Sequence, residues 1–366
     1  MPDRFPHVSI LSSVIFLLTF FCPSSFAAID NLVRESSIAS NLAAPSAIAV
    51  DSGGGLYVSE SGKNRLLVFS SSGVYLSRLT GLNKPLGIAV GGDGRIYVCN
   101  AGRRNVEVYG TGLNQLFKLG AGNGEFELPV GIALAPNGNI YVADARACVV
   151  KVYLPDGTYA FSFGGGGNGD GKFNFPTSVS IDAATGNVVV SDLQLTLTGT
   201  RGARVQVFDM NGGFLRKFGI YDLDNCNLDP EKCLVRPVGT AVDTDGRIYV
   251  SDAFLHRVQV YDGNGVHLKN IADTNRPLRT PLGVAVNDGA GKLYVASLNS
   301  STVEVYGSGA SGSGTLTFSG SGGGGGCSVA GRPAGPGTSA PGSLLPFLCL
   351  FLCLLVRRRT GRSQMR

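Results

Sequence analysis

Short runs of alternating hydrophobic and polar residues recur along most of this chain. The stretch 237–261, PVGTAVDTDGRIYVSDAFLHRVQVY, contains three such runs: Val238–Val242, Arg247–Ser251 and Arg257–Tyr261. A period of two places successive side chains on opposite faces of an extended backbone, so each run is predicted to be a β-strand. The Asp245-Gly246 dipeptide between the first two runs favours a tight hairpin turn.

The same pattern occurs in five further copies. Their spacing of roughly 40 to 60 residues lies in the range of propeller blades and solenoid units. The other copies start near Ser46, Leu86, Val130, Thr177 and Leu282. Each copy follows a proline or begins at one. A fourth run, such as Phe214–Phe218, separates each copy from the next. Four short strands per repeat with glycine-rich turns are typical of a blade. The predicted fold is therefore all-β, a six-bladed β-propeller of four-stranded antiparallel blades.

Three motifs carry a resemblance to a known family. P-x-G-[IV]-A-V, D-G-x-[IL]-Y-V-x-D and R-V-Q-V-[FY], together with the connector Gly122–Pro129, resemble the NHL-repeat family of β-propellers. The resemblance covers residues 32–306 in six units. It implies the fold far more than an activity, because one fold carries many functions.

The last repeat ends its third strand near Tyr306 and so lacks a fourth strand of its own. An open edge strand invites aggregation, and the ring is therefore expected to close. We expect Leu32–Ile38 to supply the missing strand and to fasten the two ends of the ring together. Thr315–Phe318 is the alternative.

The N-terminal segment 1–27 has the pattern of a secretory signal. Arg4 precedes the apolar run Ile10–Phe21, and Ser25-Phe26-Ala27 has small residues at the positions of a cleavage site. Cleavage is expected between Ala27 and Ala28. The remaining propeller, residues 28–306, would then be exported.

The C-terminal part changes composition twice. Residues 307–342 are dominated by Gly, Ser, Ala and Pro, which predicts a flexible stalk. The segment 343–366 contains the apolar run Leu344–Val356 followed by Arg357–Arg359, which resembles the C-terminal sorting signals of bacterial surface proteins, with processing near Cys327. A plain membrane anchor is the alternative. The expected location is a bacterial cell surface, or the periplasmic or outer membrane face, with the protein held at the membrane by this segment or released after processing.

The positive charge of the chain belongs to these terminal segments. The whole chain has a formal net charge of +5, but without the two ends 24 basic residues stand against 25 acidic ones. Nucleic-acid surfaces depend on clustered Lys and Arg. We therefore expect no nucleic-acid partner, although the NHL family includes RNA-binding members.

Two insertions are expected on one face of the ring, where loops between second and third strands and connectors between blades meet. Leu193–Ala203 lengthens the first kind of loop in blade four, and Ile220–Arg236 lengthens the connector to blade five. Long loops on a rigid scaffold commonly carry function, and neutral loop growth is the alternative. We expect a protein or a glycan to bind there. The candidate residues are Leu193, Thr196, Thr198, Arg201, Tyr221, Asp222, Asp224, Lys232 and Arg236.

The cysteines in the propeller fall into two pairs. Cys226 and Cys233 are close in sequence, and in an exported protein this spacing favours a local disulfide. Cys99 and Cys148 lie in different repeats. The sequence leaves open whether they pair or remain buried thiols.

Acids and bases recur around the loop after strand two, as in Glu60 with Arg65, Asp192 with Arg204 and Asp252 with Arg257. Their repetition favours a structural role, in which the carboxylate accepts hydrogen bonds from turn amides or from an arginine.

Signatures of catalysis are sparse. The propeller has two histidines, His256 and His267, which are too few for a histidine-based metal site. No G-x-S-x-G motif or phosphate-binding loop is present, and no cofactor is assigned. We expect a non-catalytic binding scaffold. The alternatives are a metal-dependent propeller lyase or lactonase with a carboxylate-lined channel, and a structural component of a surface layer.

Overall fold

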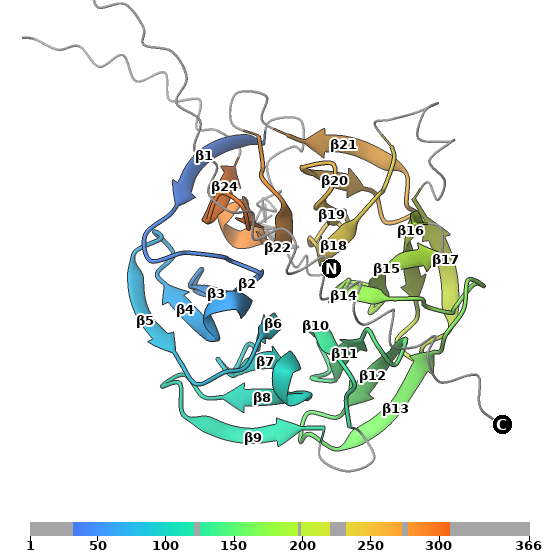
Figure 1. The fold of residues 1–366 in the computed structure, drawn as a ribbon, viewed down its shortest axis with the longest axis horizontal. Helices are drawn as coiled ribbons and strands as arrows, with labels where there is room; N and C mark the ends of the chain where they lie inside the picture. Colours follow the sequence, from blue (N-terminus) through green and yellow to red (C-terminus); the bar gives the residue numbers. More distant parts are fainter. Residues whose placement is uncertain (1–31, 121–124, 197–198, 220–231, 273–276, 308–366) are drawn as a thin grey trace, which may run out of the picture. The chain divides into compact units, whose positions relative to one another are not determined.

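Six four-stranded antiparallel sheets surround a common axis, as the ribbon in Figure 1 shows. The computed structural model describes residues 32–120, 125–196, 199–219, 232–272 and 277–307, all within the unit Met1–Ser311. The predicted six-bladed β-propeller is confirmed. The strands coincide closely with the predicted runs, because the period of two leaves few choices of register.

Within each of the first five blades the four strands follow one another in sequence order. Blade one contains β2 (Ala47–Val50), β3 (Leu56–Glu60), β4 (Arg65–Phe69) and β5 (Tyr75–Leu79). Blade two contains β6 (Pro85–Val90), β7 (Ile96–Asn100), β8 (Asn105–Tyr109) and β9 (Gln115–Leu119). Blade three contains β10 (Pro129–Leu134), β11 (Ile140–Asp144), β12 (Val149–Tyr153) and β13 (Tyr159–Gly164).

Blades four and five repeat this order. Blade four contains β14 (Pro176–Ile181), β15 (Val188–Thr196), β16 (Gly199–Phe208) and β17 (Phe214–Phe218). Blade five contains β18 (Pro237–Val242), β19 (Ile248–Asp252), β20 (Arg257–Tyr261) and β21 (His267–Ile271). Three short 3-10 turns complete the described elements: η2 (Ser61–Lys63), η3 (Ala101–Arg103) and η4 (Asp288–Ala290).

Blade six joins the two ends of the described chain. It contains β22 (Pro281–Asn287), β23 (Lys292–Ser297) and β24 (Thr302–Gly307), and its outer strand is β1 (Val33–Ile38). β1 pairs antiparallel with β24, from Val33 opposite Gly307 to Ile38 opposite Val303. The expected closing strand is therefore confirmed. An ion pair between Arg34 and Glu304 and a second one between Lys292 and Glu35 hold it in place.

Glycines allow the inner strands of neighbouring blades to approach one another closely. A Cβ atom added to Gly131 would lie 2.8 Å from Cα of Ser178, and one added to Gly239 would lie 2.4 Å from the carbonyl oxygen of Leu282. Gly87 meets Val130 in the same way. Glycine is therefore required at the third position of the P-x-G motif, because the backbones of neighbouring blades leave no room for a Cβ atom there.

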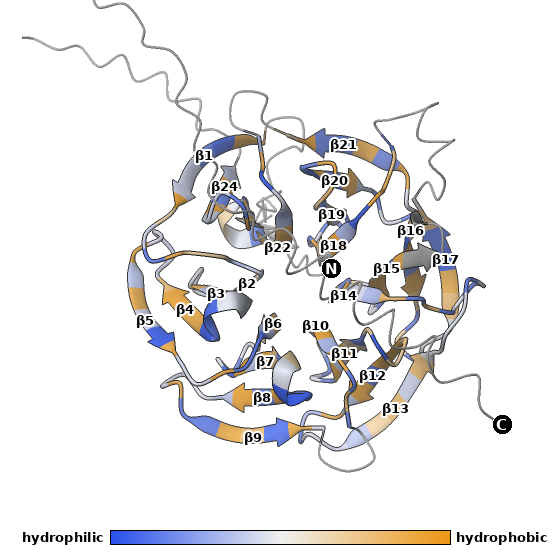
Figure 2. Ribbon diagram, in the orientation of Figure 1, coloured by the Kyte–Doolittle hydropathy of each residue, from blue (hydrophilic) through white to orange (hydrophobic). Residues whose placement is uncertain are grey.

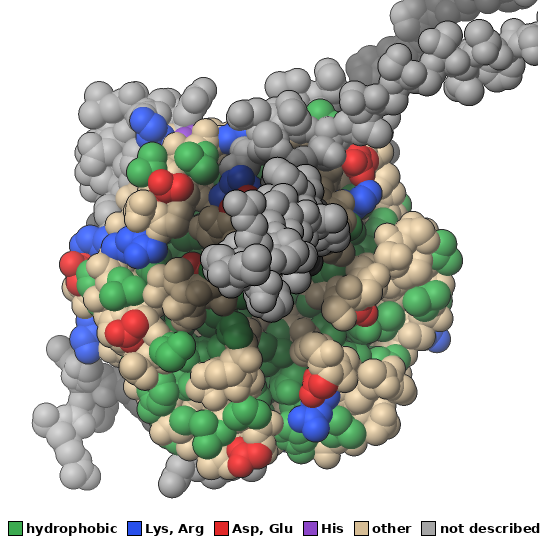
Figure 3. All heavy atoms as spheres, turned by 180° about the vertical axis from the view of Figure 1, so that it is seen from behind, with side chains coloured by type: hydrophobic (Ala, Val, Ile, Leu, Met, Phe, Trp, Pro, Cys, Tyr) green, Lys and Arg blue, Asp and Glu red, His purple; other side chains and the backbone are tan. Residues whose placement is uncertain are grey.

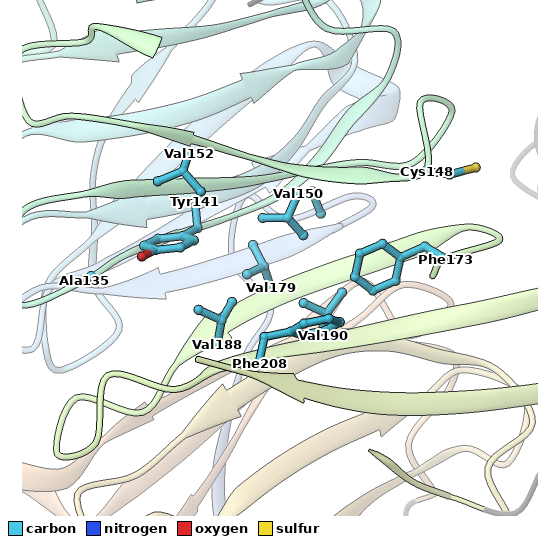
Figure 4. Close-up of a cluster of buried hydrophobic side chains, with 11 residues drawn as sticks. Ala135, Tyr141, Cys148, Val150, Val152, Phe173, Val179, Val188, Val190 and Phe208 are labelled. Carbon is cyan, nitrogen blue, oxygen red and sulfur yellow. The ribbon is translucent and has the colours of Figure 1, made fainter. Parts of the chain in front are cut away.

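Buried hydrophobic side chains fill the space between adjacent blades. Figure 4 shows the cluster between blades three and four, where Tyr141 and Val152 face Val188 and Phe208. Fully burying each such side chain contributes about 1.5–3 kcal/mol. Each blade therefore depends on its neighbours for stability.

Polar alternation is strongest at the rim. In Figure 2 the outer strands β5, β9, β17 and β21 alternate along their length between hydrophobic and hydrophilic residues. Their second residues, Leu76, Leu116, Leu215 and Leu268, are exposed. The rim thus leaves one leucine of each of these strands in water.

The predicted signal (1–27) and C-terminal segment (343–366) lie outside the described residues, as do the alternative strand Thr315–Phe318 and the stalk beyond Gly307. Among the residues that are described, no helix is long and apolar enough to cross a membrane.

Candidate ligand-binding face

One face of the ring is formed by the loops between second and third strands and by the connectors between blades. We call it the connector face. The described loops on this face are 61–64, 101–104, 145–148, 253–256 and 298–301, together with the tip of the β15–β16 hairpin. The described parts of the connectors are 39–46, 80–84, 120 with 125–128, 165–175, 219 with 232–236, and 272 with 277–280. The strands that flank the two predicted insertions, β15 with β16 and β17 with β18, border this face.

The last residue of each second strand holds the connector that leads into its own blade. The carboxylate of Asp144 accepts hydrogen bonds from the backbone N–H groups of Glu127 and Leu128, both at 2.8 Å. The same position holds connector amides in the other blades through Glu60, Asn100, Asp192, Asp252 and Ser297. The predicted structural role of these carboxylates is confirmed.

A cation from each of the first five blades completes this arrangement by donating to a connector carbonyl. Arg65 donates from Nη2 to the carbonyl oxygen of Asn41 at 2.8 Å, and Arg257 donates to that of Cys233 at 3.1 Å. Lys151 donates to the carbonyl of Glu125 and also forms an ion pair with Asp144 at 3.2 Å. We call the strand-two acceptor together with this cation the clasp of a blade.

The clasp of blade four is the most extensive. Arg204, whose side chain is 1% exposed, donates from Nε to Asp192 at 3.0 Å. Its Nη groups donate to carbonyl oxygens of the glycine-rich connector, including those of Asn168 at 2.8 Å and Gly169 at 3.1 Å. The connector therefore wraps around a buried guanidinium. Burial raises the pKa of Asp192 although Arg204 and two connector amides oppose the shift.

Blade two uses a different arrangement. Its strand-two acceptor is the neutral Asn100, and the carboxylate is Glu107, in the middle of β8. Glu107 is fully buried, accepts hydrogen bonds from Arg103 at 3.0 Å and from the hydroxyl of Tyr109, and lies 3.7 Å from Nζ of Lys118. Burial acts to raise the pKa of Glu107, but the hydrogen bonds from Tyr109 and Arg103 outweigh it, and the pKa is lowered.

The first insertion is largely a β-hairpin. β15 and β16 continue beyond the blade, with Leu195 opposite Thr200 and Thr196 opposite Gly199. Leu193 is 4% exposed, and its backbone N–H donates to the carbonyl of Phe175. It is therefore a buried framework residue and is not available to a ligand. Thr196 ends β15 and Arg201 lies within β16, whereas Thr198 is outside the described residues.

The second insertion is described at its C-terminal end. Tyr221, Asp222 and Asp224 lie outside the described residues. Lys232 is exposed, and Arg236 is half-buried with its backbone N–H donating to Asp252 at 3.1 Å.

The cysteine predictions have different outcomes. Cys233 is buried, but Cys226 is outside the described residues, so their disulfide stays a prediction. Cys99 and Cys148 are buried thiols that do not form a disulfide with each other. Burial raises the pKa of Cys99. In Figure 4 the sulfur of Cys148 points away from the other labelled side chains.

The inner strands that surround the channel carry no ionisable side chain; this holds for β2, β6, β10, β14, β18 and β22. Hydroxyl groups provide most of their polarity, as in the hydrogen bond of 3.0 Å between Ser180 and Thr240. Carboxylates just beyond these strands accept bonds from turn amides, as Asp51 does from Gly53 and Gly55. On the face seen in Figure 3, charged side chains lie mainly toward the rim.

The histidines are also used locally. Nδ1 of His256 accepts a hydrogen bond from the backbone N–H of Thr280 at 3.1 Å, and Nε2 of His267 lies 3.0 Å from Asn270. Within the described ranges, no three His, Cys, Asp or Glu side chains gather in a way that could hold a metal ion.

Sequence reasoning did not identify a cavity in blade two, at the rim of the connector face. Arg103 and Arg104 line it together with Lys118 from β9. The available signal was the pair of adjacent arginines in the loop between the second and third strands.

Comparisons with known proteins agree with this architecture. The family model for the NHL repeat matches residues 234–261. The Protein brain tumor of Drosophila melanogaster is 26% identical over 116 residues, which are 32% of this chain and 10% of that protein. The chain thus matches about a tenth of the length of that relative.

Solved structures of similar fold include three enzymes. A gluconolactonase from Xanthomonas campestris has a TM-score of 0.58 at 15% identity, covering 77% of this chain and 96% of its own. A streptogramin B lyase has a TM-score of 0.54 at 12% identity, covering 76% and 98%. Virginiamycin B lyase from Staphylococcus aureus has a TM-score of 0.51 at 13% identity, covering 75% and 88%. At such identities the similarity concerns the fold.

Proposed function

The chain is a six-bladed β-propeller of the NHL-repeat family, and we propose that it is a non-catalytic scaffold that binds a protein or a glycan through its connector face. The observation that carries this proposal is the position of the two insertions. By their place in the chain they lengthen a loop and a connector on the same face at the neighbouring blades four and five, and the hairpin of the first continues the strands that carry the most buried clasp, that of Asp192 and Arg204. Loops on a rigid base are a common way to build a binding surface.

The clasps supply the rigidity that such a surface needs. The described residues of each connector that lead into its blade are tied by hydrogen bonds to a side chain at the end of strand two, so their backbone loses little further freedom when a ligand binds. Association then costs less conformational entropy.

The chemistry of the channel supports a non-catalytic role. The competing function is a metal-dependent lyase or lactonase, which would need carboxylates directed into the channel. The inner strands have hydroxyl and aliphatic side chains instead, and carboxylates such as Asp51 and Asp243 accept bonds from turn amides.

Export and surface attachment are part of the same proposal. The signal 1–27 would direct secretion with cleavage between Ala27 and Ala28, and the segment 343–366 would hold the protein at a bacterial membrane until processing near Cys327. Mass spectrometry of the membrane-extracted protein tests this, because an intact C-terminus at Arg366 would mean a simple anchor.

The scaffold proposal is tested by shortening the insertion in blade four. In the variant, Gln194–Gly202 is replaced by Asn-Gly, which joins Leu193 to Ala203 through a two-residue hairpin turn. Parent and variant are screened in the full-length secreted form against an array of glycans and a library of displayed extracellular domains. We expect the parent to bind a ligand and the variant to lose it while its Tm is retained.

Metal content and turnover provide the decisive counter-test. The purified protein is assayed for bound metal and for hydrolysis of lactones and cleavage of lyase substrates. Stoichiometric Ca²⁺ or Zn²⁺ together with turnover would contradict the scaffold proposal and support the enzyme.

A further inference from the structure

In the cavity of blade two, three cations gather around an opening on the connector face. Its volume is about 290 Å³. Three consecutive residues line it where η3 leads into β8, and three more come from β9 and the connector to blade three; they are Arg103, Arg104, Asn105, Lys118, Glu125 and Phe126. A side chain or a small acidic group fits in a space of this size.

Arg104 is fixed in position but has no acidic partner. Its backbone has the left-handed φ of 60°, and its Nε donates to the carbonyl oxygen of Phe126 at 3.0 Å. None of the described carboxylates forms an ion pair with it. The adjoining residues 121–124, which the structure does not describe, are Ala-Gly-Asn-Gly and contain no acid. Its charge is therefore available to a ligand.

The other charges at the cavity leave an excess of positive charge. Arg103 and Lys118 share one buried acid, Glu107, at 3.0 Å and 3.7 Å. The exposed Glu125 stands at the edge and is the one acid among the cavity-lining residues. Three cations thus face two acids.

An apolar contact lies beside the cations. Leu116 is 45% exposed and precedes Lys118 by two residues on β9, so both side chains project from the same face of that strand. A ligand with a carboxylate beside an aliphatic side chain matches this arrangement. Extended peptide places residues i and i+2 on one side at the same spacing.

We propose that this cavity binds an acidic peptide segment of a protein partner, with a Glu or Asp side chain on Arg104 and Lys118 and an apolar side chain on Leu116. The proposal rests on the proposed function only in that the partner approaches the connector face. Planar guanidinium groups bind carboxylates through two parallel hydrogen bonds, which makes Arg104 the main contact.

The test uses the full-length secreted protein and a fluorescein-labelled peptide of alternating glutamate and leucine, with binding followed by fluorescence anisotropy. Arg104→Gln is expected to weaken binding about tenfold, because a charged hydrogen bond is lost. Lys118→Gln should also weaken binding. Because Lys118 is exposed, a loss in this variant cannot be explained by a disturbed connector, which Arg104→Gln alone would leave open. Glu125→Gln should strengthen binding, since it removes the acid that repels the peptide.

Blade one offers a matched control. Leu76 and Arg78 on β5 occupy the positions of Leu116 and Lys118, but Arg65, the cation of the clasp there, is paired with Glu60. Arg78→Gln should leave peptide affinity unchanged. An equal loss in Arg78→Gln, or equal binding of the glutamine–leucine peptide, would overturn the proposal.

Two further outcomes are decisive. Preference for labelled oligogalacturonate over the peptide would assign the cavity to an acidic glycan and overturn the peptide assignment, as would failure of the peptide to bind. The hairpin variant in blade four should bind the peptide like the parent, so this test and the test of the scaffold proposal can fail separately.

Discussion

Blades two and four hold their connectors with the same chemical groups placed differently. In blade four the carboxylate of Asp192 ends strand two, and Arg204 is buried with it beneath the glycine-rich connector. In blade two the carboxylate of Glu107 lies in the third strand, and its cations Arg103 and Lys118 are about half exposed. Both are carboxylate–cation networks, but they differ in exposure to water.

The two carboxylates respond to their surroundings in opposite directions. Burial dominates at Asp192 and raises its pKa, whereas at Glu107 the hydrogen bonds from Tyr109 and Arg103 overcome burial and lower its pKa. Both carboxylates are buried and accept several hydrogen bonds, but the cations of Glu107 are half exposed whereas Arg204 is buried with Asp192, and only at Glu107 do the donors outweigh burial. The difference also leaves blade two with exposed cations for a ligand.

The largest effect is expected from Arg204→Met. Removing one partner of a buried ion pair leaves Asp192 uncompensated and should lower the free energy of unfolding by about 3–5 kcal/mol. Without Arg204 the pKa of Asp192 rises further, so the folded state takes up a proton more readily than the unfolded state. The destabilisation should therefore be smaller at about pH 4.5 than at about pH 7. Urea unfolding of parent and variant at these two pH values measures it. An equal loss at both would contradict the assigned pKa direction.

A smaller effect is expected from Glu107→Gln. The variant weakens charge-assisted hydrogen bonds and should lose about 1–3 kcal/mol at neutral pH. The lowered pKa of Glu107 means that its contribution is present above the unfolded-state pKa and is lost as the pH falls through the folded-state pKa. Parent and variant should therefore converge in acid. Thermal melts across that pH range provide the measurement, and a constant difference would refute the role of ionised Glu107.

The smallest effect on stability is expected from Lys118→Gln. Its side chain is 47% exposed and lies 3.7 Å from Glu107, so the change should cost about 0–1 kcal/mol. Because stability is nearly unchanged, loss of peptide binding in the same variant would report on the cavity alone. A drop as large as that of Glu107→Gln would show that Lys118 belongs to the framework of the blade.

The sequence by itself determined the architecture of the ring. Alternation with a period of two, the Asp245-Gly246 turn and six copies of one motif are local signals, and local backbone rules act on them wherever they occur. The missing fourth strand of blade six followed from counting, and β1 fills it. The structural role of the repeated acids was also predictable, because a group that recurs in several repeats is expected to stabilise the blade structure that all repeats have in common.

Only the tertiary structure decided which distant groups meet. Arg204 binds the carbonyl of Asn168, 36 residues away, and no pattern within a repeat indicates that contact. Leu193 looked available in an insertion but is buried, because the strands continue into the hairpin. The cavity arises where Arg104 meets the next connector and Lys118 stands beside it. Such encounters depend on how blades pack against one another, and therefore on distances that the order of residues does not contain.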